Sequence, residues 1–112
     1  MGRMVIGPTG RGQKVVAVAG TPVPLSATTL LVQNVTISAP TLNSGNIYVG
    51  DSLVSNVNGA IIPPGQSMGL GADSLESDNV AASLDLSQIY IDADFAGDKV
   101  LLLTFDIISE EA

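Results

Sequence analysis

Residues 29–39 read TLLVQNVTISA, the longest segment of the chain that is rich in β-branched and aliphatic residues. Val35 and Ile37 alternate with polar residues, which is the period of a strand with one buried face. Val32 lies on the opposite parity. The segment therefore predicts a strand that is interrupted by a bulge or another irregularity near residues 33–34.

The sequence on either side supplies more short apolar segments, separated by glycine and proline. Asn58-Gly59 favours a two-residue hairpin turn and predicts that residues 53–57 pair with residues 60–62. Residues 63–66 (PPGQ) are typical of a type II turn with Pro64 and Gly65 at its centre. The other expected extended segments are residues 14–19, 21–24, 47–49, 67–70, 84–91 and 99–108. About eight short strands with frequent turns predict an all-β fold, an antiparallel β-sandwich or jelly roll.

Two parts of this pattern carry a further expectation. Residues 99–108 (KVLLLTFDII) are apolar on both parities, which predicts a strand buried on both faces, in the core or under a neighbouring subunit. Residues 71–83 are polar and acidic, and we interpret them as an excursion from the sheet.

Residues 1–13 contain four glycines and one proline, which interrupt every regular element. We predict a flexible basic N-terminal arm at 1–13 and a single domain at 14–112. Arg3, Arg11 and Lys14 are the candidate partner-binding residues, since such an arm can order against an acidic or grooved surface.

Charge divides the chain into two halves. Residues 1–50 contain Arg3, Arg11 and Lys14 and no acid, giving +3, and residues 51–112 contain all eleven acids and Lys99, giving −10. An acidic body repels phosphate, so we expect no nucleic-acid partner. No apolar run approaches the ~20 residues that span a bilayer, so we expect no membrane partner either. The apolar run at residues 4–6 is too short for a secretory signal, which predicts that the protein is made in the cytoplasm and used without Sec export.

The absence of histidine and cysteine removes Ser-His and Cys-His nucleophiles and the usual zinc and copper ligand sets. We expect no enzymatic activity and no cofactor. Asp92, Asp94 and Asp98 in DADFAGD are the one candidate set for a hard cation such as Ca²⁺. The stretch lacks the EF-hand spacing, and a solvated loop with Asp and Gly in turn positions is the alternative that we favour.

Several motifs resemble a family of small virion proteins of tailed bacteriophages. They are GNIYVGD at 45–51, the Asn58-Gly59 turn followed by IIPPGQS at 61–67, and LSQIYIDAD at 86–94 with the apolar strand at 97–103. The resemblance covers about residues 29–105. It implies a β-sandwich in a phage particle, with capsid decoration (cement) protein as one assignment.

The resemblance also implies partners and a location. It implies that the chain binds the major capsid protein or other virion proteins at the capsid surface, as a homo-oligomer, with a trimer favoured. Two alternatives stay open: another virion component (head-fibre base, neck, tail or baseplate accessory protein) and a glycan-binding adhesion module. The small number of aromatic residues disfavours the second alternative.

Overall fold

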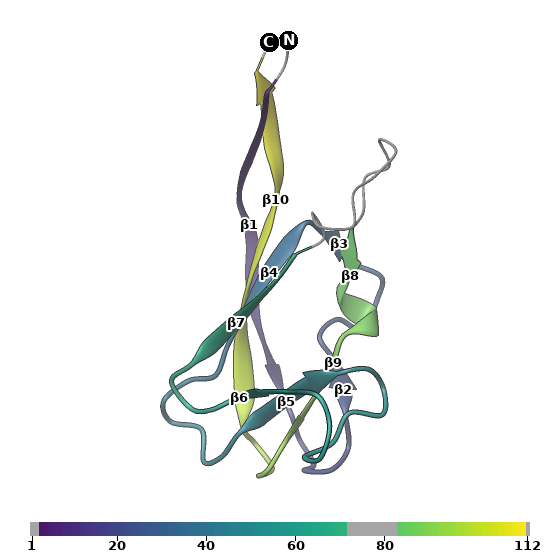
Figure 1. Cartoon of the computed structure of the whole chain (residues 1–112), viewed down its shortest axis with the longest axis vertical. Coiled ribbons are helices and arrows are strands. Elements are labelled where there is room, and N and C mark those ends of the chain that lie inside the picture. Colours follow the sequence, from purple (N-terminus) through teal and green to yellow (C-terminus); the bar gives the residue numbers. More distant parts are fainter. Residues whose placement is uncertain (1–2, 72–82, 112) are drawn as a thin grey trace.

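The chain folds as two packed antiparallel sheets, as the sequence predicts. The computed structural model describes residues 3–71 and 83–111. The first sheet has the order β1-β10-β4-β7 and the second has the order β2-β9-β5-β6, while β3 and β8 form a separate pair (Figure 1). The strands are β1 (Arg3–Val15), β2 (Val23–Pro24), β3 (Leu31–Val32), β4 (Asn34–Ser38), β5 (Ile47–Gly50), β6 (Ala60–Ile62), β7 (Ser67–Gly71), β8 (Leu84–Asp85), β9 (Tyr90–Ala93) and β10 (Lys99–Glu111).

The core lies between the two sheets and is made almost entirely of aliphatic side chains. Ile37 on β4 and Val100 on β10 face it from the first sheet, and Ile47 on β5 and Ile91 on β9 face it from the second; each is fully buried. The alternation read at residues 34–38 is present, because Val35 and Ile37 are buried and their neighbours are half-buried.

Backbone geometry confirms two local predictions. The segment 29–39 breaks at Gln33, so that β3 and β4 belong to different sheets. Gln33 N–H donates to the carbonyl of Phe105 (3.1 Å), and the next residue, Asn34, is the register partner of the same Phe105. The Pro63–Gln66 turn closes with Gln66 N–H on the Pro63 carbonyl (3.0 Å), and Gly65 has the positive φ, 84°, that a type II turn requires.

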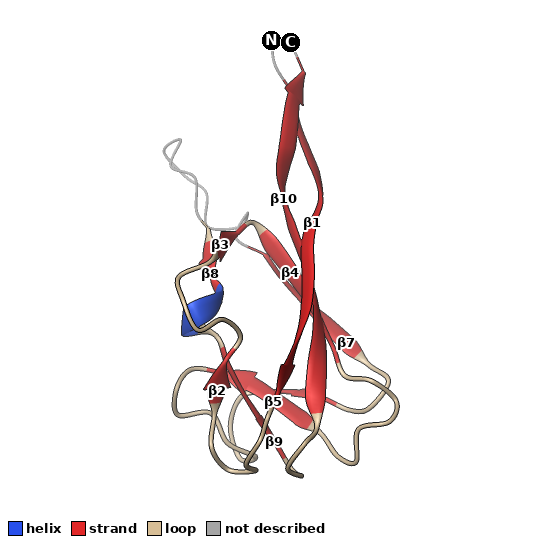
Figure 2. Ribbon diagram, turned by 180° about the vertical axis from the view of Figure 1, so that it is seen from behind, coloured by secondary structure: helices blue, strands red, loops and turns tan. Residues whose placement is uncertain are grey.

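Two other predictions are wrong, one in the pairing of a strand and one in its continuity. β6 pairs with β5, not with residues 53–57, which form turns around an isolated Ser55–Asn58 bridge. The reason is local, since the Asn58 side chain accepts from Ser55 N–H (2.9 Å) and holds the segment as a compact loop. The expected strand at 84–91 is divided by the 3-10 turn η2 (Leu86–Gln88), which the Asp85 carboxylate caps at Ser87 N–H (3.0 Å) (Figure 2).

The segment expected as a flexible arm, residues 1–13, is a strand in its described part, because residues 3–15 form β1 and pair with β10. Two register shifts, between Val5 and Ile6 and between Pro8 and Gly10, absorb the irregular residues. Gly10 is required at the second shift, since a Cβ there would lie 2.9 Å from Thr104 Oγ1, which donates to the Gly10 carbonyl. The expected domain boundary at residue 14 therefore falls inside a strand.

Beyond Asn34, the first residue of β4, the first sheet narrows to a two-stranded ribbon. Phe105 is the last residue of β10 that pairs with β4, whereas β10 continues with β1 as far as the Arg3–Glu111 pair. We call residues 3–7 and 106–111 the ribbon. Figures 1 and 2 both show it projecting beyond the sandwich, and the principal extents of the molecule are 50 × 26 × 22 Å.

Within the single chain, the described side chains of the last strand are buried on one face. Val100, Leu102 and Thr104 are buried, whereas Leu101 and Leu103 remain 45% and 38% exposed. The core therefore covers only one face of β10. The expected acidic excursion lies mostly outside the described residues. Nowhere in residues 3–71 and 83–111 is there a helix with the length and hydropathy to cross a bilayer.

Candidate functional site

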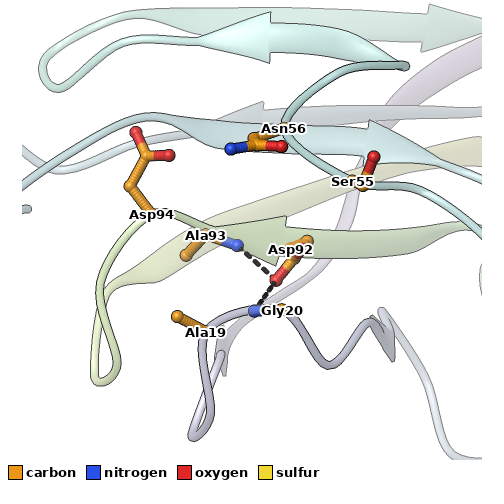
Figure 3. Close-up of a pocket in the computed structure, with 7 residues that line it drawn as sticks. All are labelled: Ala19, Gly20, Ser55, Asn56, Asp92, Ala93 and Asp94. Atoms are coloured by element: carbon orange, nitrogen blue, oxygen red, sulfur yellow. Dashed lines mark hydrogen bonds between the residues drawn. The ribbon is translucent and has the colours of Figure 1, made fainter.

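Asp92 joins the first interstrand loop to the end of β9. Its carboxylate is buried and Oδ1 accepts from the backbone N–H groups of Gly20 (2.9 Å) and Ala93 (2.8 Å) (Figure 3). Gly20 has a φ of 88°, which an L side chain adopts only with strain. Asp92 therefore fixes the β1–β2 loop over the outer face of the second sheet.

Asp94 performs a similar task two residues further on. It accepts from Asn46 N–H (3.1 Å) and from the Tyr48 hydroxyl (2.9 and 3.1 Å to its two oxygens). Burial of the ring, followed by the hydrogen bond to Asp94, raises the pKa of Tyr48 above its ordinary value. This pair ties β5 to the turn that follows β9.

Asp98 closes the loop between β4 and β5. Its buried carboxylate accepts from Ser44 N–H (2.9 and 3.1 Å) and from Gly45 N–H (2.9 Å). Gly45 lets the loop lie against Phe95, because a Cβ there would be 2.7 Å from the Phe95 ring. The carboxylate therefore satisfies two backbone donors of this loop.

The structure places Asp92, Asp94 and Asp98, the candidate set for a hard cation, against backbone donors of the surrounding loops. Asp92 accepts from the β1–β2 loop, whereas Asp94 and Asp98 both accept from the β4–β5 loop, and residues 3–71 and 83–111 contain no group of three acidic side chains placed to hold a metal ion. The composition of DADFAGD reflects three structural hydrogen-bond acceptors, which is how Asp commonly serves in turns.

A pocket of about 280 Å³ remains beside two of these carboxylates. Three chain segments line it, and the lining residues are Ala19, Gly20, Ser55, Asn56, Asp92, Ala93 and Asp94 (Figure 3). The hydroxyl, amide and carboxylate groups make this a hydrogen-bonding surface. Sequence reasoning missed Ser55 and Asn56 because residues 53–57 were interpreted as a strand. The signal was present, since Asp51, Asn56 and Asn58 are turn-forming residues.

Exposed apolar side chains flank each of the three segments that line the pocket. Val18 precedes Ala19, Val57 follows Asn56 and Phe95 follows Asp94, with 59%, 86% and 53% of their surface exposed. Leu53, on the same loop as Val57, is also exposed. We call Val18, Leu53, Val57 and Phe95 the loop surface.

A second exposed surface lies on the outer face of the first sheet. The register places Leu103 beside Arg11 and Thr36, and Leu101 beside Gln13 and Ser38. A hollow of about 370 Å³ is formed here by Pro8, Thr9, Gly10, Arg11 and Leu103.

The three predicted partner-binding residues do not form one patch. Arg11 is exposed beside Leu103, and Lys14 is half-buried opposite Val100, on the other parity of β1. Arg3 pairs in register with Glu111 at the far end of the ribbon. The register also places an acidic strand end against the basic one, so the expected basic arm is part of a ribbon that carries both charges.

Comparison with models of known protein families gave no match, and comparison with curated proteins gave no relative.

Proposed function

We propose that this chain is a structural protein of a tailed-phage particle, and that it serves as a capsid decoration protein. In this role it binds the outer surface of the assembled shell and stabilises it. The resemblance of residues 29–105 to small virion proteins supports the setting. The fold is consistent with the proposal, since the three clustered aspartates are each accounted for by hydrogen bonds that hold loops.

The observation that carries the proposal is the loop surface. A domain of this size normally buries side chains such as Leu53 and Val57, which are 79% and 86% exposed here. Exposed apolar side chains that are grouped around polar ones are typical of protein–protein interfaces. A capsid shell offers a fixed protein surface for such contacts.

The charge of the chain fits the outside of a shell. The formal net charge is −7, and an acidic protein is repelled by packaged nucleic acid. The same charge keeps a protein with exposed apolar loops soluble before it binds.

Copy number is the first test. A decoration protein is present at nearly the copy number of the major capsid protein, whereas a neck, tail or baseplate part is present in far fewer copies. Quantitative mass spectrometry of purified particles of the encoding phage measures this ratio directly. A low ratio would overturn decoration in favour of the other virion roles.

A matched pair of variants tests the loop surface. Val57→Asp places a charge on the loop surface and should weaken binding to particles lacking this protein by about tenfold or more. Leu42→Asp is the control, because Leu42 is 93% exposed on a different loop. Equal affinity of the two variants would remove the loop surface from the binding interface.

The glycan-binding alternative has one observation in its favour. The pocket combines hydroxyl, amide and carboxylate groups, the exposed Phe95 follows the lining residue Asp94 in the chain, and sugars are bound by polar groups together with aromatic rings. A glycan array probed with the folded protein tests it. Binding that is lost in Asn56→Ala would favour adhesion, and an array without binding would end this alternative.

A further inference from the structure

We propose that the edge of β1 around Gly12 receives an extended segment of another protein as an added strand. One aliphatic side chain of that segment fills a hollow beside Gly12, and an acidic side chain lies next to Arg11. The residues that form this site are different from those of the loop surface. The inference therefore goes beyond the decoration role and does not depend on it.

The backbone of β1 presents hydrogen-bonding groups at an open edge. β1 is the outermost strand of the first sheet, and among the described strands it pairs with β10 alone. Val16, the residue after β1, exchanges backbone hydrogen bonds of 2.9 and 2.8 Å with the loop that precedes β10. Peptide groups alternate in direction along an antiparallel strand, so Gly12 also turns its N–H and C=O to β10. Arg11 and Gln13 therefore turn theirs to the open edge, where an added strand can pair with them.

A hollow of about 230 Å³ lies along this part of the edge, and we call it the edge hollow. Its lining includes residues 10–13 of β1, Leu102 on β10, and Leu25, Leu30 and Leu86 from the segments that follow β2 and β8. Successive side chains of a strand point to opposite faces, so four consecutive residues line one hollow only where it reaches the backbone edge of the strand. The edge hollow therefore opens where Arg11 and Gln13 turn their peptide groups outward.

Gly12 leaves the edge hollow open to a side chain of the partner. The register partner of Gly12, Leu102, is buried, so position 12 faces the interior of the sandwich. A Cβ at Gly12 would meet no atom within 4 Å. The residue of an added strand that lies opposite Gly12 faces the same way, and its side chain enters the edge hollow. A cavity of ~150 Å³ lined by aliphatic side chains accommodates benzene, so the edge hollow has room for one large aliphatic side chain.

The far wall of the edge hollow is held in place by backbone hydrogen bonds. Leu25 N–H donates to the carbonyl of Ile89 (2.8 Å), and Leu86 N–H donates to the carbonyl of Leu30 (2.9 Å). The near wall, β1, is held by its pairing with β10. The site is therefore formed before binding, which lowers the entropic cost of binding. Main-chain pairing at a sheet edge, combined with a pocket for an alternate side chain, is a recurrent mode of peptide recognition.

Charge favours an acidic segment. Arg11 is the one charged residue among the described residues that line the edge hollow, and it is exposed. Asp85 stands beside the lining residue Leu86, but its carboxylate accepts from the N–H groups of Leu30 and Ser87. Opposite charges that face each other across two strands are stabilising. In an antiparallel segment, the residue opposite Arg11 directly follows the residue opposite Gly12, so the segment carries an aliphatic residue followed by Asp or Glu.

The same strand of a second copy does not meet these requirements. Its Gly10 and Gly12 bring no side chain to the edge hollow, and its Arg11 brings a like charge. We therefore assign the edge to a segment of a different protein, and self-association becomes an outcome of the test.

A yeast-displayed library of short random peptides tests the proposal. Peptides are selected on the folded chain and counter-selected on Gly12→Val, whose side chain enters the edge hollow. We expect enriched peptides to carry an aliphatic residue followed by Asp or Glu, and to bind Gly12→Val about tenfold more weakly or worse. A library without enrichment, or enriched peptides that bind both proteins equally, overturns the proposal.

Gly69→Val is the matched control. Gly69 lies in β7, at the opposite edge of the same sheet, and a Cβ there also meets no atom within 4 Å. This variant should bind the selected peptides as the parent chain does, and the Tm of each variant establishes that it folds. Equal loss of binding in the two variants would mean that valine in an edge strand is the cause, and would overturn the role of the edge hollow.

A second pair of variants tests the main-chain contacts. Gln13→Pro removes the N–H that faces the open edge, and an edge strand tolerates proline at such a position. Gln13→Ala shortens the side chain and keeps the N–H. Affinity for a selected peptide should fall about fivefold or more in Gln13→Pro and stay within about twofold in Gln13→Ala. Equal affinities of the two variants contradict strand addition.

Native mass spectrometry of the chain alone separates a partner protein from a second copy. The proposal expects Gly12→Val to leave the oligomeric state unchanged. Self-association that Gly12→Val abolishes would assign the edge to a second copy and overturn the proposal.

Discussion

The sandwich and the ribbon share the same two strands, yet they are different kinds of structure. Within the sandwich, β10 has β1 on one side, β4 on the other, and a second sheet across the core. Within the ribbon, β10 has β1 alone. The comparison teaches that strand content alone does not stabilise a segment, because hydrogen bonds contribute little net free energy without the apolar burial that accompanies them.

Amide hydrogen exchange should show the largest difference between the ribbon and the sandwich. In dilute protein, we expect the amides of residues 4–7 to exchange roughly a thousandfold faster than those of Val35 and Ile37, because core strands open only with global unfolding. Mass spectrometry of the exchanged peptides measures this. Similar exchange rates in the ribbon and in β4 would show that the ribbon is as stable as the sandwich.

Truncation of apolar side chains sharpens the contrast within the first sheet. Ile37→Ala should lower the free energy of unfolding by about 2–5 kcal/mol, since Ile37 is fully buried between the sheets. Leu103→Ala, on the outer face of the same sheet, should lower it by less than about 1 kcal/mol. Urea denaturation at low protein concentration gives both values, and similar losses would mean that the outer face is covered in the single chain.

Loss of a loop carboxylate should lower the free energy of unfolding most where the carboxylate is buried. Asp98→Ala leaves the N–H groups of Ser44 and Gly45 without their acceptor and should lower the free energy of unfolding by about 1.5–3 kcal/mol. Asp51→Ala is the control, because exposed Asp51 accepts from Leu53 N–H in an open turn. A loss for Asp51→Ala as large as that for Asp98→Ala would contradict the importance of burial.

The smallest effect concerns Tyr48 and high pH. Its folded-state pKa is raised above the ordinary value of 10.0, so its contribution to stability is complete below that value and is lost as pH rises through the folded pKa. Tyr48→Phe should therefore show a shallower loss of stability above pH 10 than the parent chain. Thermal denaturation at a series of alkaline pH values measures the difference, and parallel curves would show that Tyr48 does not titrate differently on folding.

The sandwich could be predicted from the sequence far better than the ribbon. Periodicity at Val35 and Ile37, the break near residue 33 and the Pro64-Gly65 turn are local signals, and each has its counterpart in the structure. The β1 strand has no such signal, because its glycines and Pro8 read locally as breakers. It forms because β10 supplies a partner edge almost a hundred residues away in the chain, which no local pattern encodes.

The candidate site divides in the same way. The spacing of Asp92, Asp94 and Asp98 indicated clustered oxygen atoms, but not that Gly20, Asn46 and Ser44 would bring backbone donors to them. Those partners come from loops distant in sequence. The apolar loop residues Leu53 and Val57 were interpreted as strand residues, because exposure depends on tertiary packing and not on residue type.

The pairing of Arg3 with Glu111 has a practical consequence for anyone who modifies this protein. The two ends of the described chain lie together at the tip of the ribbon, remote from the loop surface. A peptide fused to either end would leave the molecule from the same place, so a matched pair of N- and C-terminal fusions would present their cargo at one site. The direction in which such a cargo leaves the molecule would be fixed by the ribbon rather than by the linker.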